Sequence, residues 1–154
     1  MKIFSLLLLF LLLPLFAFSQ ETGGEEKGEE EKRSSLSVFF GGTTNSESSA
    51  FTIGADYQYR ISRLFGIGAL IDHATGDIQS TIIGPTLFLH VSNFEFTVAP
   101  VIENSDDEWS PVLRLGVGYE IELPVLAIVP GVFFDTERGG ERSVVYGVSF
   151  VFKI

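Results

Sequence analysis

Apolar and polar residues alternate through eight short segments of this chain, and this two-residue period constrains its fold more than any other feature. Successive side chains of a β-strand point to opposite faces, so each segment indicates a strand with one apolar and one polar face. Beyond residue 34 we find no helical period of useful length. The sequence therefore predicts an all-β domain with strands at residues 35–43, 50–60, 64–73, 80–91, 94–103, 111–121, 125–135 and 143–153.

The connections between these segments alternate in length. The longer connections are 44–49, 74–79, 104–110 and 136–142, and the shorter ones are 61–63, 92–93 and 122–124. In an antiparallel up-and-down arrangement, this alternation places all long loops at one rim and all tight turns at the other. An even number of strands also brings both ends of the 34–154 region to the rim with the tight turns. Transmembrane barrels show the same asymmetry, with tight turns in the periplasm and longer loops outside.

The character of the two faces decides which one points inward. A soluble lipocalin-like barrel would turn its apolar face inward around a ligand and carry many charges outside. Here the polar face holds one or two charges and one or two glycines per strand, which suits the narrow interior of an eight-stranded barrel. We therefore expect an apolar outer face in contact with lipid. The charges expected in the lumen are Asp56, Arg60, Glu95, Arg114, Glu120, Glu122 and Lys153.

Aromatic residues gather near the two ends of the expected strands, as in the aromatic girdles of transmembrane barrels. A strand of about ten residues also matches the thickness of the hydrocarbon core when it is tilted. The band near the tight turns comprises Tyr57, Tyr59, Phe94, Phe96, Tyr119, Phe150 and Phe152, and the band near the loops comprises Phe51, Trp109, Phe133 and Tyr146.

The first 33 residues have a different composition. Residues 1–19 carry one lysine, an apolar run and Ala17-Phe18-Ser19, which is the pattern of a cleaved signal peptide. Residues 20–33 contain six Glu and almost nothing apolar, so we expect a disordered acidic leader. An uncleaved membrane anchor is the alternative for the first segment. The barrel domain is then 34–154.

Charge and cysteine content exclude several classes of function. The net charge of −10 disfavours a nucleic-acid partner, because phosphate binding needs a basic surface. The absence of Cys excludes disulfides, thiolate metal sites, a cysteine nucleophile and a lipoprotein anchor. The Gly-x-Gly pairs at Gly66/Gly68 and Gly116/Gly118 lie within strands and have no helix after them, so they are not phosphate loops. We expect no cofactor.

The signal sequence, the eight strands and the short turns resemble the small outer-membrane barrels of the OmpX and OmpA-barrel kind. The closing segment from Tyr146 to Ile154 is similar to the C-terminal signal that the barrel-assembly machinery reads, although that signal usually ends in an aromatic residue. The resemblance implies a bacterial outer-membrane location with both termini in the periplasm and the four longer loops outside. It implies outer-membrane lipid and the assembly machinery as partners, and a monomeric barrel.

Three groups of residues suggest chemistry. The lumen charges form either a catalytic or ion-binding set or, as we expect, a plug of ion pairs, because buried charges need partners. His90-Val91-Ser92 has the spacing of outer-membrane lipid A deacylases, but hairpin register should keep Glu103 about 20 Å from His90. His73 with Asp72 and Asp77, or Asp106-Asp107-Glu108, are oxygen-rich candidates for a divalent cation, although no loop motif matches.

These observations predict a non-enzymatic outer-membrane barrel with a structural, envelope-integrity or surface-interaction role and a lumen filled by side chains. The alternatives are a membrane-embedded enzyme that modifies lipids and a soluble lipocalin-like carrier.

Overall fold

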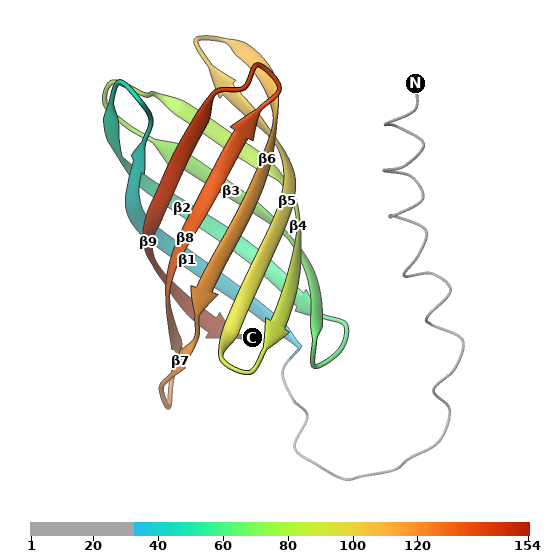
Figure 1. The fold of residues 1–154 in the computed structure, drawn as a ribbon. Helices are drawn as coiled ribbons and strands as arrows, with labels where there is room; N and C mark the ends of the chain where they lie inside the picture. Colours follow the sequence, from blue (N-terminus) through green and yellow to red (C-terminus); the bar gives the residue numbers. More distant parts are fainter. Residues whose placement is uncertain (1–32) are drawn as a thin grey trace, which may run out of the picture. The chain divides into compact units, whose positions relative to one another are not determined.

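The computed structural model describes residues 33–154, which form an antiparallel barrel (Figure 1). The signal peptide expected at 1–19 and the leader expected at 20–33 lie outside the described residues, apart from Arg33. The strands are β1 (Ser34–Thr44), β2 (Ser49–Arg60), β3 (Phe65–Ala74), β4 (Ser80–Val91), β5 (Phe94–Ser105), β6 (Glu108–Tyr119), β7 (Ile121–Glu122), β8 (Ala127–Glu137) and β9 (Arg142–Lys153). Within this part of the chain no helix has the length and hydrophobicity of a membrane span.

The sheet closes because its first strand pairs with its last. Sequential neighbours pair from β1 to β6, β6 pairs with β8, and β8 pairs with β9, which returns to β1. The closure brings two glycines together, since Gly41 lies opposite Gly147. A Cβ at Gly41 would collide with the carbonyl oxygen of Tyr146 and with the ring of Phe39, so the two strands approach this closely only without side chains there.

The short strand β7 continues β6 in the same register, so the barrel has eight strands in structural terms. Gly118 lies opposite Gly131, and Ile121 lies opposite Ile128, which leaves the register unchanged across the break. The break falls where Tyr119 would lie opposite Pro130. Proline has no N–H to donate, so the ladder loses a hydrogen bond at this point. The eight predicted strands are therefore confirmed, with this interruption in the sixth.

The pairing of β4 with β5 has a second interruption, at residues 84–86 and 99–101. We call this interruption the proline seam. The register is the same on both sides of it, but the three pairs within it are not bonded as a ladder. In an antiparallel ladder, hydrogen-bonding and non-bonding pairs alternate, and the Val91–Phe94 pair that closes the two-residue turn is a hydrogen-bonding one. Pro85 lies opposite Pro100 six residues further along each strand, so these two prolines also occupy a hydrogen-bonding pair. Because neither proline has an N–H, both hydrogen bonds of this pair are missing.

Side chains alternate between the lumen and the outer surface along every strand. In β2, Thr52 and Gln58 are buried in the lumen, whereas Phe51 and Ile53 are 55% and 42% exposed on the outside. Part of the lumen wall is apolar, formed by a cluster of Leu70, Ile82, Ala99, Val101 and Val112. The lumen is thus mainly polar and filled, and the outside is apolar.

The loops are shorter than the sequence indicated. Only residues 45–48, 75–79, 106–107 and 138–141 lie outside strands at one rim, against 61–64, 92–93 and 123–126 at the other. The largest difference concerns 104–110, where Ser105 pairs with Glu108 around a two-residue turn. Asp106 and Asp107 both have positive φ, 50° and 64°, as a type I′ turn requires. The expected contrast in loop length between the rims was therefore wrong, because strand pairing extends further than alternation reveals.

Both ends of the barrel domain lie at the rim formed by 61–64, 92–93 and 123–126 (Figure 1). The N–H of Ile154 donates to the carbonyl oxygen of Ser34 at 2.8 Å, and the N–H of Arg60 donates to that of Arg33 at 2.7 Å. We call this rim the turn side and the opposite rim the loop side.

Candidate functional site

The centre of the lumen is occupied by Arg114, Asp72 and Asp135, which we call the central ion cluster. Arg114 and Asp135 lie opposite each other on β6 and β8, and Asp72 comes from β3. The Arg114 Nε and Nη2 groups donate to both Asp135 carboxylate oxygens at 2.8 and 2.9 Å, and Nη1 donates to Asp72. Arg114 and Asp135 are each only 2% exposed. This is a bidentate pair with a third partner, and it is well suited to burying a guanidinium group.

An aromatic ring completes the surroundings of this guanidinium group. The Arg114 carbon Cζ lies 5.4 Å from the centre of the Phe133 ring, which is close enough for a cation–π contact. Phe133 in turn packs edge-to-face against Phe39, with ring centres 5.9 Å apart. We expected Phe133 in the loop-side aromatic band, and this was wrong. Asp135 and Arg114 fix the inward face of this stretch of β8, and Gly116 opposite Phe133 leaves room for its ring.

Near the turn side, Arg60, Glu120, Glu122 and Lys153 form a second group, the turn-side ion cluster. Arg60 Nη2 lies 3.1 Å from a Glu120 oxygen, and Lys153 Nζ lies 2.6 Å from Glu122 and 3.9 Å from Glu120. Lys153 and Glu122 are partly open to solvent at the end of the barrel. The hydrogen bond from Lys153 holds the pKa of Glu122 below its ordinary value.

Between the two clusters lie a histidine, an amide and two carboxylates. Gln58 and His90 are in contact, with Gln58 Nε2 2.7 Å from His90 Nε2, and the same His90 nitrogen lies 3.7 Å from Glu95. Asp56 accepts a hydrogen bond from the Ser37 hydroxyl group. These side chains come from β1, β2, β4 and β5, so the polar faces of four strands meet inside the barrel.

The seven charges that the sequence places in the lumen are distributed over these groups. Arg60, Glu120, Glu122 and Lys153 are brought together, Arg114 lies in the central ion cluster, and Asp56 and Glu95 lie between. Sequence reasoning singled out Asp72 and His90 for other sites and missed both as lumen residues, and it missed Asp135 altogether. The alternation of β3 gave a usable signal, since Gly66, Gly68, Leu70 and Asp72 share one face.

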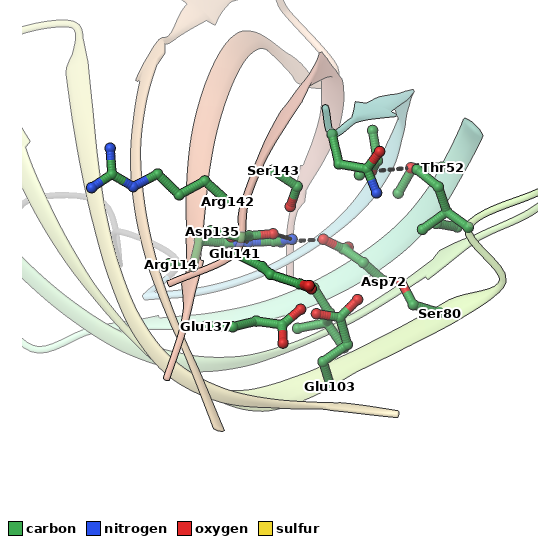
Figure 2. A pocket seen from close by; sticks show the side chains of 15 residues that line it. Thr52, Asp72, Ser80, Glu103, Arg114, Asp135, Glu137, Glu141, Arg142 and Ser143 are labelled. Atoms are coloured by element: carbon green, nitrogen blue, oxygen red, sulfur yellow. Dashed lines mark hydrogen bonds and ion pairs between the residues drawn. The ribbon is translucent and has the colours of Figure 1, made fainter. Parts of the chain in front are cut away.

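In the part of the chain that the structure describes, a small cavity lies on each side of the central ion cluster. The loop-side cavity has a volume of about 50 Å³, and Figure 2 shows Glu103, Glu137 and Glu141 around it beside Arg114 and Asp72. The turn-side cavity, of about 40 Å³, is lined by polar groups that include Asp56, Thr86 and Glu95. Asp72 and Arg114 line both cavities, so the central ion cluster separates them. Each cavity has room for only a few water molecules.

Glu137 is the last residue of β8 and lies at the loop-side rim. Burial raises its pKa above the ordinary value, and repulsion from Glu103 and Glu141 adds to the effect. The loop-side mouth of the lumen is therefore strongly acidic.

The outer surface carries the remaining predicted residues. Nine of the eleven aromatic side chains expected in the bands are 39–59% exposed: Tyr57, Tyr59, Phe94, Phe96, Tyr119, Phe152, Phe51, Trp109 and Tyr146. Phe150 is half-buried and packs edge-to-face against Phe40, with ring centres 6.2 Å apart. Phe134, next to the inward Phe133, is 53% exposed and takes the outward position in β8.

The other candidate sites of the sequence are not assembled. His73 is exposed on the outer face and contacts the Thr81 hydroxyl group at 2.9 Å, whereas its neighbour Asp72 points into the lumen. His90 lies opposite Glu95, whereas Glu103 lies opposite Ile82 and Ser110, further along β5. Among residues 33–154 no three His, Asp or Glu side chains are placed to hold a metal ion.

This arrangement, a closed barrel with an apolar outside and a filled polar lumen, defines a small transmembrane-type β-barrel. Solved structures of such barrels are similar to it. A de novo designed transmembrane β-barrel matches with a TM-score of 0.56 at 18% identity, over 76% of this chain and 94% of the designed one. Neisserial surface protein A matches with a TM-score of 0.54 at 13% identity, over 79% and 96%.

More particularly, the fold is that of the small eight-stranded outer-membrane β-barrels. The N-terminal β-barrel domain of OprF from Pseudomonas aeruginosa matches with a TM-score of 0.55 at 13% identity, over 77% of this chain and 97% of that domain. No protein-family model and no curated protein matches the sequence. At these identities the likeness concerns the fold.

Proposed function

We propose that this protein is a bacterial outer-membrane barrel without enzymatic activity, with a structural, envelope-integrity or surface-interaction role. The observation that carries the proposal is the inverted polarity of the barrel. Among residues 33–154, thirty large apolar side chains are exposed, including Phe51, Leu115 and Val117, while Arg114 and Asp135 are buried in the lumen. In water this surface would be an extreme apolar patch, but in lipid it is the expected one.

Because the lumen is filled, it supports a function of the outer wall and the rims of the barrel rather than transport through the lumen. The two cavities hold only a few waters each, and a guanidinium group with two carboxylates lies between them. A lipocalin-like carrier would need a large apolar interior, which this arrangement does not favour. For the lipid-modifying enzyme, the separation of His90 from Glu103 along the hairpin is unfavourable.

The orientation that we propose has both termini in the periplasm and residues 45–48, 75–79, 106–107 and 138–141 outside the cell. It rests on the position of the chain ends at the turn side and on the resemblance to outer-membrane barrels, because loop length does not distinguish the rims. Outer-membrane lipid and the barrel-assembly machinery are the proposed partners. Closure of the sheet removes free strand edges, which supports a monomer.

Membrane fractionation followed by a mild SDS gel tests the location and the closed barrel together. We expect the full chain in the outer-membrane fraction, with a faster-moving band without boiling than after boiling. Recovery in the soluble fraction without a mobility shift would contradict the proposal. A barrel that shifts on heating but fractionates elsewhere would contradict the location alone.

The orientation is testable because the chain contains no Cys. A single cysteine in the loop-side segment (Asp77→Cys) should react with a membrane-impermeant maleimide on intact cells. The matched turn-side variant (Arg63→Cys) should react only after the outer membrane is permeabilised. The reverse pattern of labelling would show the opposite orientation.

A further inference from the structure

The barrel interior holds more negative than positive charge. Among the described residues, Asp56, Asp72, Glu95, Glu120 and Asp135 lie in the lumen at the central ion cluster or on its turn side, and Glu103 and Glu137 line the loop-side cavity. The inward arginines are Arg60 and Arg114, and Lys153 pairs with Glu122 at the turn-side end. Both arginines are already engaged, Arg114 by Asp72 and Asp135, and Arg60 by Glu120. A carboxylate in a membrane-embedded interior needs a compensating positive charge or a proton.

On the turn side of the central ion cluster, Asp56 and Glu95 are two lumen carboxylates that are not paired with an arginine. Within residues 33–154 the ion pairs of the arginines go to Glu120, Asp72 and Asp135 and not to either of these carboxylates. Glu95 has His90 Nε2 at 3.7 Å, but that nitrogen is in contact with the amide of Gln58. The Gln58 amide oxygen accepts from the Ser35 hydroxyl group, so its nitrogen faces His90. An amide nitrogen only donates, so the His90 nitrogen accepts and its ring is neutral.

Both carboxylates line the turn-side cavity, and this cavity also contains an unsatisfied hydroxyl group. Thr86 is 2% exposed, and its Oγ1 has no hydrogen-bond partner within the described part of the chain. A buried polar atom without a partner is costly, and such atoms commonly mark an unoccupied site for water or an ion. Thr97 and Ser149 add further hydroxyl groups to the lining. The cavity therefore collects oxygen atoms and negative charge, and the one cation in its lining, Arg114, is already paired with Asp72 and Asp135.

We propose that the turn-side cavity binds one small monovalent cation, with Asp56, Glu95 and Thr86 as its oxygen ligands. Carboxylate and hydroxyl oxygens are the ligands of hard cations. The cost of removing an ion from water grows with the square of its charge, and a divalent ion needs six or more oxygens in a defined geometry. The cavity, of about 40 Å³, has room for a sodium ion with one or two waters but little for a hydrated divalent ion.

The site is tested by measuring how sodium changes the thermal stability of the full chain in detergent. The protein is first dialysed into choline chloride and then titrated with NaCl at constant ionic strength, because choline is too large for the cavity. We expect a saturable rise of the melting temperature and a matching broadening of the ²³Na NMR signal. Glu95→Gln and Thr86→Val should each shift the titration at least tenfold to higher sodium concentration. Glu103→Gln, the same charge change on the loop-side cavity, should leave the midpoint unchanged.

Three results would overturn the proposal. Stability in choline chloride that does not rise with sodium would show that Asp56 and Glu95 are neutralised by protons. A rise that Glu95→Gln and Thr86→Val both leave unchanged would place the ion elsewhere. A saturable response to calcium or magnesium without one to sodium would contradict the monovalent class. Because Thr86→Val preserves shape and charge, the test remains decisive even if a carboxylate variant does not fold.

Discussion

Replacing Arg114 with methionine should destabilise the barrel more than any other single loss of a charge. The substitution keeps a long side chain in place but leaves Asp72 and Asp135 without their shared cation. Three hydrogen bonds to the guanidinium group disappear, and so does its contact with the Phe133 ring. Removing one partner of a buried ion pair costs about 3–5 kcal/mol, because the remaining charge stays buried. We expect a loss within this range.

The measurement is urea unfolding of the barrel in detergent or lipid vesicles, followed by tryptophan fluorescence from Trp109 and by the heat-dependent mobility shift. Arg60→Met is the matched control. Arg60 pairs with Glu120 near the open end of the barrel, where its side chain is 33% exposed, so its loss should cost about 1 kcal/mol or less.

A neutral version of the central ion cluster distinguishes charge from packing. Arg114→Met combined with Asp72→Asn and Asp135→Asn removes the unpaired charges and should recover most of the stability lost by Arg114→Met alone. If Arg114→Met costs no more than Arg60→Met, or if the triple variant is no more stable than the single one, the reasoning about the central ion cluster is refuted.

Three further predictions concern the ladder, the packing and the loop-side mouth. Pro100→Val restores one donor to the proline seam and should stabilise the barrel by about 1 kcal/mol relative to Pro111→Val. Pro111 lies opposite Ile102 at a position that makes no ladder hydrogen bonds to β5, so Pro111→Val restores none. Urea unfolding should therefore show a higher stability for Pro100→Val than for Pro111→Val. Gly116→Val places a Cβ on the Phe133 ring and should cost about 1–3 kcal/mol, unless Phe133→Leu accompanies it. The raised pKa of Glu137 means that the folded state favours its protonated form, so stability should fall as the pH rises through the interval between the ordinary value and the raised one. Glu137→Gln should flatten this pH dependence, and an unchanged pH profile would refute the role of Glu137.

The position of both chain ends is more informative about orientation than the loops are. The turn-side connections contain two to four residues outside strands, and the loop-side connections contain two to five. Loops of this size offer a limited platform for a partner, so a surface-interaction role would depend mainly on the side chains at the rim. The acidic residues Glu103, Glu137 and Glu141 around the loop-side cavity give that rim its distinct chemical character.

The alternation of the sequence determined the eight strands, the closed architecture that they imply and the direction of nearly every side chain. This was possible because the pleat of a strand is a local property, and neighbouring residues alone assign the face. Residues Phe51 to Arg60 could therefore be assigned to lipid or lumen without knowledge of their neighbours in space. The same rule placed Arg60, Glu120 and Lys153 in the interior.

Only the tertiary structure decided which interior groups meet. Arg114 lies 42 residues from Asp72 and 21 from Asp135, and their contact depends on the stagger of strands around the closed barrel. The packing of the inward Phe133 ring depends on the space that Gly116 leaves on the neighbouring strand, and the two-residue turn at Asp106 and Asp107 depends on pairing beyond the alternating segments. The physical reason is common to these cases: the face of a side chain is set by local geometry, whereas its partner is set by long-range register, which no local pattern records.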